Sequence, residues 1–270
     1  MRMPRSAYHS TPETSACVRV LRTCSSSGGG GGNSSRSSSA TAGLPNLPTD
    51  QTNMVVRALT LFRNKLTERD GGSLAVPRFR AHLVKLLPLD AGLGGAASNA
   101  ATALFGANEL CGRPASAKEL CEWASELGSD VVSFLAGTGT AVCSGRAVFL
   151  RAEHVAPLAP LTQDPFFVIT LELGPWSTPA LFRGLAATDS GTDSKSGVSI
   201  GTEALLAAFG ANRDTALALP DDAALYVNDL EEPASRCHPE LAMVRERLLM
   251  REHFCVAAMS GAGPSLFAFG

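Results

Sequence analysis

The chain has 270 residues, of which 45% are hydrophobic and 18% charged, and its formal net charge is -2. This length accommodates two ordinary domains with separate cores, and the nearly neutral charge provides no broad basic surface for nucleic acid or an anionic membrane. No segment approaches the roughly 20 consecutive apolar residues of a membrane-spanning helix. We therefore expect two globular domains that bind neither nucleic acid nor membrane, and the oligomeric state stays open.

The seven cysteines are odd in number and scattered along the chain. They form no Cys-x-x-Cys pair, and no histidine lies near them at zinc-binding spacing. We interpret them as reduced packing thiols of an intracellular protein, and we expect no metal site built from protein side chains.

Residues 1–47 are rich in Ser, Gly and Arg, with Glu13 as their single acid and a Ser/Gly run from Ser25 to Ser39. Such a composition buries too little apolar surface to offset chain entropy, so we predict a disordered, low-complexity segment. A Ser/Arg-rich, acid-poor leader is also typical of an organelle transit peptide. Transit peptide and low-complexity loop remain alternative interpretations.

Local signals predict the elements of a first domain, residues 48–160. Asp50 and Asn53 are candidate caps of a helix with an apolar stripe at Val55, Leu59, Phe62 and Leu66. A strand is expected over 79–87, where Pro88 ends it, and an Ala-rich helix over 96–110. Ser116 and Glu119 form a capping box for a helix over 117–127 that Gly128 ends, and a strand follows over 138–143.

The Pro-bearing stretch 155–165 marks the predicted boundary to a second domain, residues 161–270. A strand is predicted over 166–173, a short helix after Ser177, and a mobile polar loop over 187–201. The final part of the chain gives a helix over 239–250, a strand over 254–259, a Gly loop and a last strand.

The most informative stretch is Pro88–Ala101, a Gly-rich turn between a strand and a helix. Glycines let consecutive backbone N–H groups point inward, and a helix N-terminus adds partial positive charge, so this geometry binds phosphate. It is neither a Walker loop nor a dinucleotide fingerprint. A purely structural turn is the alternative. The candidate phosphate-binding residues are Gly92, Leu93, Gly94, Gly95, Ala96, Ala97, Ser98 and Asn99.

This stretch resembles the phosphate loop of the GHMP superfamily of small-molecule kinases, and further segments follow in the superfamily's order. Asn53–Leu59 resembles the helix before the loop, Gly128-Ser129-Asp130 the Gly-Ser-Asp segment, and Met259–Gly263 the C-terminal Gly loop. Asn228-Asp229-Leu230-Glu231, followed by Pro233, is similar to the segment typical of 4-diphosphocytidyl-2-C-methylerythritol kinases. The resemblance covers residues 48–270.

The resemblance implies an α+β fold of two domains, ribosomal-protein-S5-like and then ferredoxin-like. It implies phosphorylation of the 2-hydroxyl of diphosphocytidyl-methylerythritol by ATP with Mg²⁺, in the non-mevalonate isoprenoid pathway. Asp130 would be the general base, and the loop of Ser260, Gly261, Ala262 and Gly263 would border the phosphates. Plant and algal members of the family imply residence in the plastid stroma.

Several departures from the family keep alternatives open. Asp90 replaces a usual Gly and Ala97 a usual Ser, while Val131–Ser133 replaces a Pro-bearing turn. The family's N-terminal lysine strand and its last helix have no counterpart, so we interpret the chain as incomplete at both ends, poorly folded and nearly inactive when expressed as written. Lys65 and Lys85 are interpreted as solvated surface charges. The alternatives are a catalytically silent GHMP-fold protein and a kinase for another alcohol.

Overall fold

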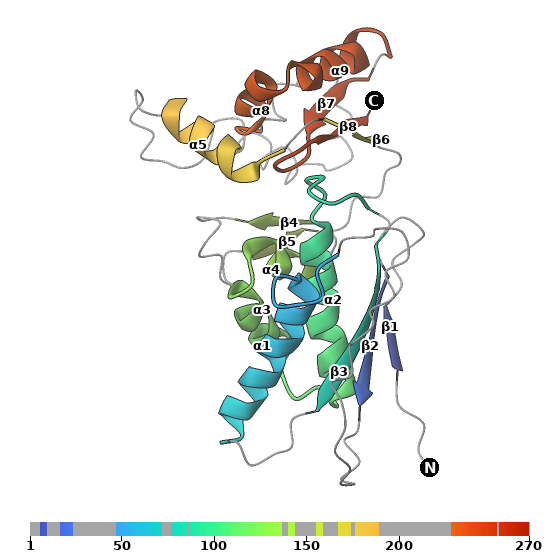
Figure 1. Ribbon diagram of the computed structural model, residues 1–270, viewed down its shortest axis with the longest axis vertical. Helices are drawn as coiled ribbons and strands as arrows, with labels where there is room; N and C mark the ends of the chain where they lie inside the picture. Colours follow the sequence, from blue (N-terminus) through green and yellow to red (C-terminus); the bar gives the residue numbers. More distant parts are fainter. Residues whose placement is uncertain are drawn as a thin grey trace. The chain divides into compact units, whose positions relative to one another are not determined.

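The computed structural model divides the chain into two compact units. The first comprises residues 1–88 and 95–160, and the second comprises residues 89–94 and 161–270 (Figure 1). Among the described residues no helix is long and apolar enough to cross a membrane. The structure describes residues 6–9, 17–23, 47–71, 77–85, 87–136, 140–143, 155–158, 167–173, 176–188, 228–252 and 254–269.

The first unit combines helices with a three-stranded sheet, and α2 packs on the sheet as well as on the other helices (Figure 1). Its core is the largest buried apolar cluster of the unit, centred on Phe62 and Leu104. The helices are α1 (Met54–Arg69), α2 (Gly95–Leu110), α3 (Ala117–Ser125) and α4 (Ser129–Leu135).

Helix α1 forms as its sequence predicts. The Asn53 side chain accepts a hydrogen bond from the Val55 N–H and caps the first turn. Val55, Leu59, Phe62 and Leu66 are all buried, which confirms the predicted apolar stripe. The stripe places Phe62 edge-on against Phe79 and Trp123, so α1 is fixed to both the sheet and α3.

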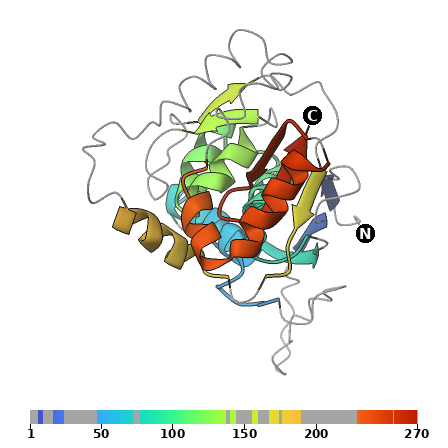
Figure 2. The ribbon, with the colours of Figure 1, turned by 90° about the horizontal axis from the view of Figure 1, so that it is seen from above.

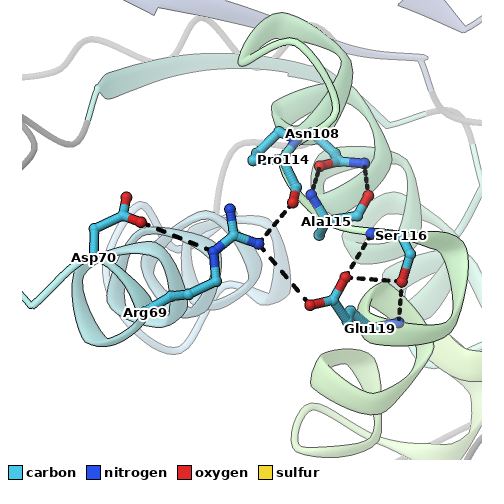
Figure 3. Close-up of polar contacts among 7 residues, drawn as sticks. All are labelled: Arg69, Asp70, Asn108, Pro114, Ala115, Ser116 and Glu119. Atoms are coloured by element: carbon cyan, nitrogen blue, oxygen red, sulfur yellow. Dashed lines mark hydrogen bonds and ion pairs between the residues drawn. The ribbon is translucent and has the colours of Figure 1, made fainter.

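Polar contacts fix the connection between α2 and α3 (Figure 3). The Asn108 amide donates to the Ala115 carbonyl at 2.8 Å and accepts from the Ala115 N–H at 3.0 Å. Ser116 and Glu119 form the predicted capping box at the start of α3. Arg69 at the end of α1 donates to the Pro114 carbonyl at 2.7 Å. These bonds satisfy backbone groups that helix ends leave unpaired, and they hold the three helices in one arrangement.

The sheet of the first unit corrects the prediction that residues 1–47 are disordered throughout. It consists of β1 (Ser6–His9), β2 (Cys17–Thr23) and β3 (Arg78–Val84), all antiparallel in that order. The reason lies in the sequence Cys-Val-Arg-Val-Leu-Arg-Thr of β2, which is rich in β-branched and apolar residues and precedes the Ser/Gly run. The average composition of the segment concealed this strand.

The stretch 155–165, which we predicted to be the domain boundary, contains the division between the two units after residue 160 and also contains a strand. Its first residues form β5 (Val155–Leu158), which pairs antiparallel with β4 (Thr140–Cys143). In a two-stranded sheet both strands are edge strands, and an edge strand accommodates proline at a position that donates no N–H to its partner. Pro157 therefore does not prevent this pairing.

The second unit contains an antiparallel sheet in the order β6-β8-β7, with helices packed on it (Figures 1 and 2). Leu241 and Leu248 of α9 are buried with Met259 and Leu266 of the sheet. The first two residues of the predicted mobile loop 187–201 are instead the last two residues of α5. The rest of that loop lies outside the described residues. The elements are β6 (Phe167–Thr170), α5 (Thr178–Thr188), α8 (Glu231–Cys237), α9 (Pro239–Met250), β7 (Val256–Met259) and β8 (Ser265–Phe269).

Candidate active site

The Gly-rich turn that precedes α2 uses a backbone conformation that favours glycine. Its φ angles are 52° at Asp90, 72° at Gly92 and 64° at Gly94. A Cβ on Gly92 would collide with the Ser260 carbonyl oxygen and would lie 2.7 Å from the Gly263 nitrogen. Gly92 is therefore required both for its φ angle and for the close approach of a second backbone segment.

That second segment is the predicted C-terminal Gly loop, Ser260–Gly263, which lies in the same unit as residues 89–94. The Ser260 hydroxyl donates to the Gly92 carbonyl at 3.0 Å, and the Ser265 N–H donates to the Ala91 carbonyl at 3.3 Å. Gly261 and Gly263 have φ angles of 52° and 69°. The structure thus brings together two Gly-rich segments that the sequence identified separately.

The helical half of the stretch begins at Gly95, the first residue of α2. Ala96 is exposed in the first turn, Asn99 is buried, and the Ser98 hydroxyl donates back to the Gly95 carbonyl at 3.2 Å. The N–H groups of this turn have no partner within the helix, so the start of α2 can donate to an anion.

Lys85 corrects our interpretation of that residue as a solvated surface charge. Its side chain is only 5% exposed, and its ammonium nitrogen lies 2.6 Å from the position that a Cβ on Gly95 would occupy. Sequence reasoning could have found it, because Lys85 shares the two-residue period of Phe79, Ala81 and Leu83 along the inward face of β3. The structure therefore adds a cation at the start of α2 to the candidate site.

Asp130 lies in the first turn of α4, in the same unit as α2. Its side chain is exposed and accepts a hydrogen bond from the Ser129 hydroxyl at 3.1 Å. Partial burial and then the nearby Asp130 carboxylate raise the pKa of the Cys143 thiol. The local turn is helical, because Val131 and Val132 are buried against the core of the unit. An exposed carboxylate can accept the proton of a bound hydroxyl, which is the role of a general base.

Comparisons with known proteins identify the family of the chain. The family model for the GHMP kinases N terminal domain matches residues 53–138. The 4-diphosphocytidyl-2-C-methyl-D-erythritol kinase of Protochlamydia amoebophila (strain UWE25) is 34% identical over 230 residues, which covers 85% of this chain and 67% of that protein. The chain belongs to the 4-diphosphocytidyl-2-C-methyl-D-erythritol kinase family.

Other members of this kinase family are similarly related. The chloroplastic kinase of Mentha piperita is 32% identical and aligns with 86% of this chain but 51% of its own length. The chain therefore spans about half the length of the plant kinases and about two thirds of the bacterial one.

Solved structures support the same fold assignment. A crystal structure of 4-(cytidine 5'-diphospho)-2C-methyl-D-erythritol kinase matches with a TM-score of 0.57 at 28% identity, and the match covers 94% of this chain and 77% of that chain. Homoserine kinase from Cytophaga hutchinsonii matches with a TM-score of 0.55 at 19% identity, which supports the fold alone. The predicted α+β GHMP-kinase fold is thereby confirmed.

The backbone conformation at Asp90 accounts for one departure from the family pattern. Asp90 occupies a position where the resemblance places Gly, and the φ angle of 52° shows why Gly suits it. A side chain in this region costs about 1–2 kcal/mol for most residues, and Asp is among those that tolerate it best. The Asp90 side chain is exposed, so its carboxylate is solvated in the structure.

Proposed function

We propose that this chain transfers the γ-phosphoryl group of ATP, bound with Mg²⁺, to the 2-hydroxyl of 4-diphosphocytidyl-2-C-methyl-D-erythritol. The observation that carries the proposal is the turn at Gly92, whose backbone is held by the loop Ser260–Gly263 and leads directly into α2. Membership of the kinase family supports the choice of the alcohol.

Each group at the candidate site has a physical role in this reaction. Backbone N–H groups of Gly92–Asn99 would donate to the phosphate oxygens, aided by the partial positive charge at the start of α2. The ammonium of Lys85 beside Gly95 would neutralise phosphate charge. Asp130 would accept the proton of the attacking hydroxyl. Because phosphoryl transfer depends mainly on positioning and charge neutralisation, these groups support the proposed chemistry.

The test is a coupled assay of ADP release with diphosphocytidyl-methylerythritol, homoserine and mevalonate offered separately. We expect turnover with the first alcohol only. Asp130→Asn should lower kcat by about 10²–10⁴-fold, the range typical for loss of a general base. Asp70→Asn, at the end of α1, is the matched control and should leave kcat unchanged. Full activity of Asp130→Asn would refute the role proposed for this carboxylate.

We also propose that the protein resides in the plastid stroma. The relatives from Mentha piperita, Oryza sativa and Arabidopsis thaliana are named as chloroplastic kinases, which supports this location. A fluorescent protein fused to the C-terminus of the full coding sequence should accumulate in plastids. Fluorescence that spreads through the cytosol would contradict the proposal.

A further inference from the structure

We infer that Asn228 and Glu231 are positioning residues for ATP, acting through the C-terminal Gly loop Ser260–Gly263. This inference rests on the proposed kinase function. It assigns the Asn-Asp-Leu-Glu segment to the nucleotide side of the reaction, whereas the sequence alone only identified it as a mark of the kinase family.

The Asn228 side chain holds both ends of the loop's first turn. Its amide nitrogen donates to the Met259 carbonyl at 2.8 Å and to the Gly261 carbonyl at 2.7 Å, while its oxygen accepts from the Leu230 N–H at 3.0 Å. Both amide hydrogens are thereby used on loop carbonyls. Aspartate would match Asn228 in shape but could not make either of these two donations.

Glu231, the first residue of α8, binds the backbone N–H of Met259, the residue that precedes the loop. One carboxylate oxygen accepts from the Met259 N–H at 2.9 Å. The other pairs with Arg245 at 2.7 Å, and Arg245 also donates to the Ala257 carbonyl at 2.9 Å. The Glu231 side chain is 18% exposed and the Arg245 side chain 38%, so the carboxylate end of the pair is the more sheltered from solvent. Together, Asn228 and Glu231 bind both backbone polar groups of Met259.

The loop passes this constraint to the turn at Gly92 through backbone contacts. The Ser260 hydroxyl bonds the Gly92 carbonyl, and a Cβ on Gly261 would lie 3.0 Å from the same oxygen. Apart from the Ser260 hydroxyl, the two segments meet through backbone atoms, which have little freedom to absorb a shift of the loop. A displacement of Ser260–Gly263 must therefore displace Gly92, whose neighbouring N–H groups are the proposed phosphate donors.

The fluorescence emission of Trp176 is sensitive to the conformation of the same loop. Its indole nitrogen donates to the Ala262 carbonyl at 2.8 Å, and its ring lies 2.6 Å from the position of a Cβ on Gly263. A change in the loop alters the hydrogen bond and the packing of this indole. The second tryptophan of the chain, Trp123, packs against Phe62 in the other unit, so Trp123→Phe isolates the Trp176 signal.

The decisive variant is Asn228→Asp, which retains the acceptor for Leu230 and loses both donations to the loop. We expect its KM for ATP to rise about tenfold or more, while the KM for diphosphocytidyl-methylerythritol stays within about twofold of wild type. Direct titration with a non-hydrolysable ATP analogue should show the same loss of affinity. In the Trp123→Phe background the Trp176 emission should shift.

Glu231 and its neighbour Glu232 provide matched variants on one helix. Glu231→Ala should raise the KM for ATP, and Glu231→Gln should recover part of the loss, because the amide oxygen still accepts from Met259. Glu232→Gln is the control, since Glu232 is exposed and pairs with Arg236. It should match wild type. The comparison of Glu231→Ala with Glu231→Gln also keeps the inference testable if Asn228→Asp fails to fold.

The outcomes separate this inference from the proposed function. Equal affinity of wild type and Asn228→Asp for the ATP analogue would overturn the inference, even if turnover were normal. A raised KM for the alcohol alone would also overturn it and assign the segment to alcohol recognition. Analogue binding by wild type that is weakened in Asn228→Asp, without turnover of any alcohol, would support the inference and contradict only the proposed reaction.

Discussion

Replacing Gly92 with alanine tests the arrangement of the two Gly-rich segments most directly. The new methyl group would be forced onto a φ angle of 72° and would collide with the Ser260 carbonyl oxygen. It would also lie 2.7 Å and 2.8 Å from the Gly263 nitrogen and oxygen. All of these atoms belong to backbone, so none can move aside as a flexible side chain would.

The expected magnitude has two parts. The left-handed backbone conformation costs about 1–2 kcal/mol for alanine. Overpacking against fixed neighbours adds about 1–3 kcal/mol. The sum of about 2–5 kcal/mol is a large fraction of the roughly 5–15 kcal/mol that stabilises a folded domain. We therefore expect either partial unfolding of the second unit or separation of the two Gly-rich segments, with at least a tenfold loss of ATP affinity.

Gly71→Ala is the matched control for the free-energy cost of placing alanine in the left-handed backbone conformation. Gly71 has a φ angle of 60°, but a Cβ placed there would meet no atom within 4 Å. Denaturant unfolding, followed by Trp123 fluorescence for Gly71→Ala and by Trp176 fluorescence for Gly92→Ala, is combined with analogue titration. Gly71→Ala should lose only about 1–2 kcal/mol and keep its ATP affinity. If Gly92→Ala loses no more stability and no more affinity than Gly71→Ala, the close approach at Gly92 is wrong.

Further predictions concern single features of the first unit and of the turn. Gly94→Val places a β-branched residue at a φ angle of 64° and should abolish binding of an ATP analogue; unchanged binding would contradict the phosphate-loop assignment. Asp90→Gly removes a carboxylate beside the loop and should lower the KM for ATP by up to about fivefold, from about 1 kcal/mol between unit charges 4 Å apart in water. An unchanged KM would mean that this carboxylate does not face the phosphates. Ser116→Ala removes the capping box of α3 and should lower the free energy of unfolding by about 1 kcal/mol, whereas equal midpoints in thermal melts would show that the cap is dispensable.

The elements that could be predicted from the sequence are those fixed by neighbouring residues. Asn53 and the stripe from Val55 to Leu66 specify α1 within one segment, and Ser116 with Glu119 specifies the start of α3. The Gly-rich stretch before α2 was recognisable because the required φ angles and the helix start follow one another along the chain.

The features that were missed depend on residues far apart in the sequence. Strand β2 pairs with β3 across the whole Ser/Gly run, so its partner could not be read from its surroundings. Asn228 bonds carbonyls about thirty positions later, and an asparagine in a polar turn carries no sign of such partners. Lys85 is the intermediate case, because the alternation of β3 indicated its inward direction although its charge suggested the opposite.

Residues 89–94 belong to the second unit, although the chain on both sides of them belongs to the first. Ser260, which bonds the Gly92 carbonyl, is synthesised 168 residues after Gly92. At about 5–20 residues per second, a translating ribosome leaves the turn without this partner for roughly 10–30 s. A nascent chain that stalls in that interval can form the helices of its first unit but not the completed turn. Competence to bind ATP is therefore acquired only after Ser260 has been synthesised, and fragments that terminate before this residue are not expected to sequester nucleotide.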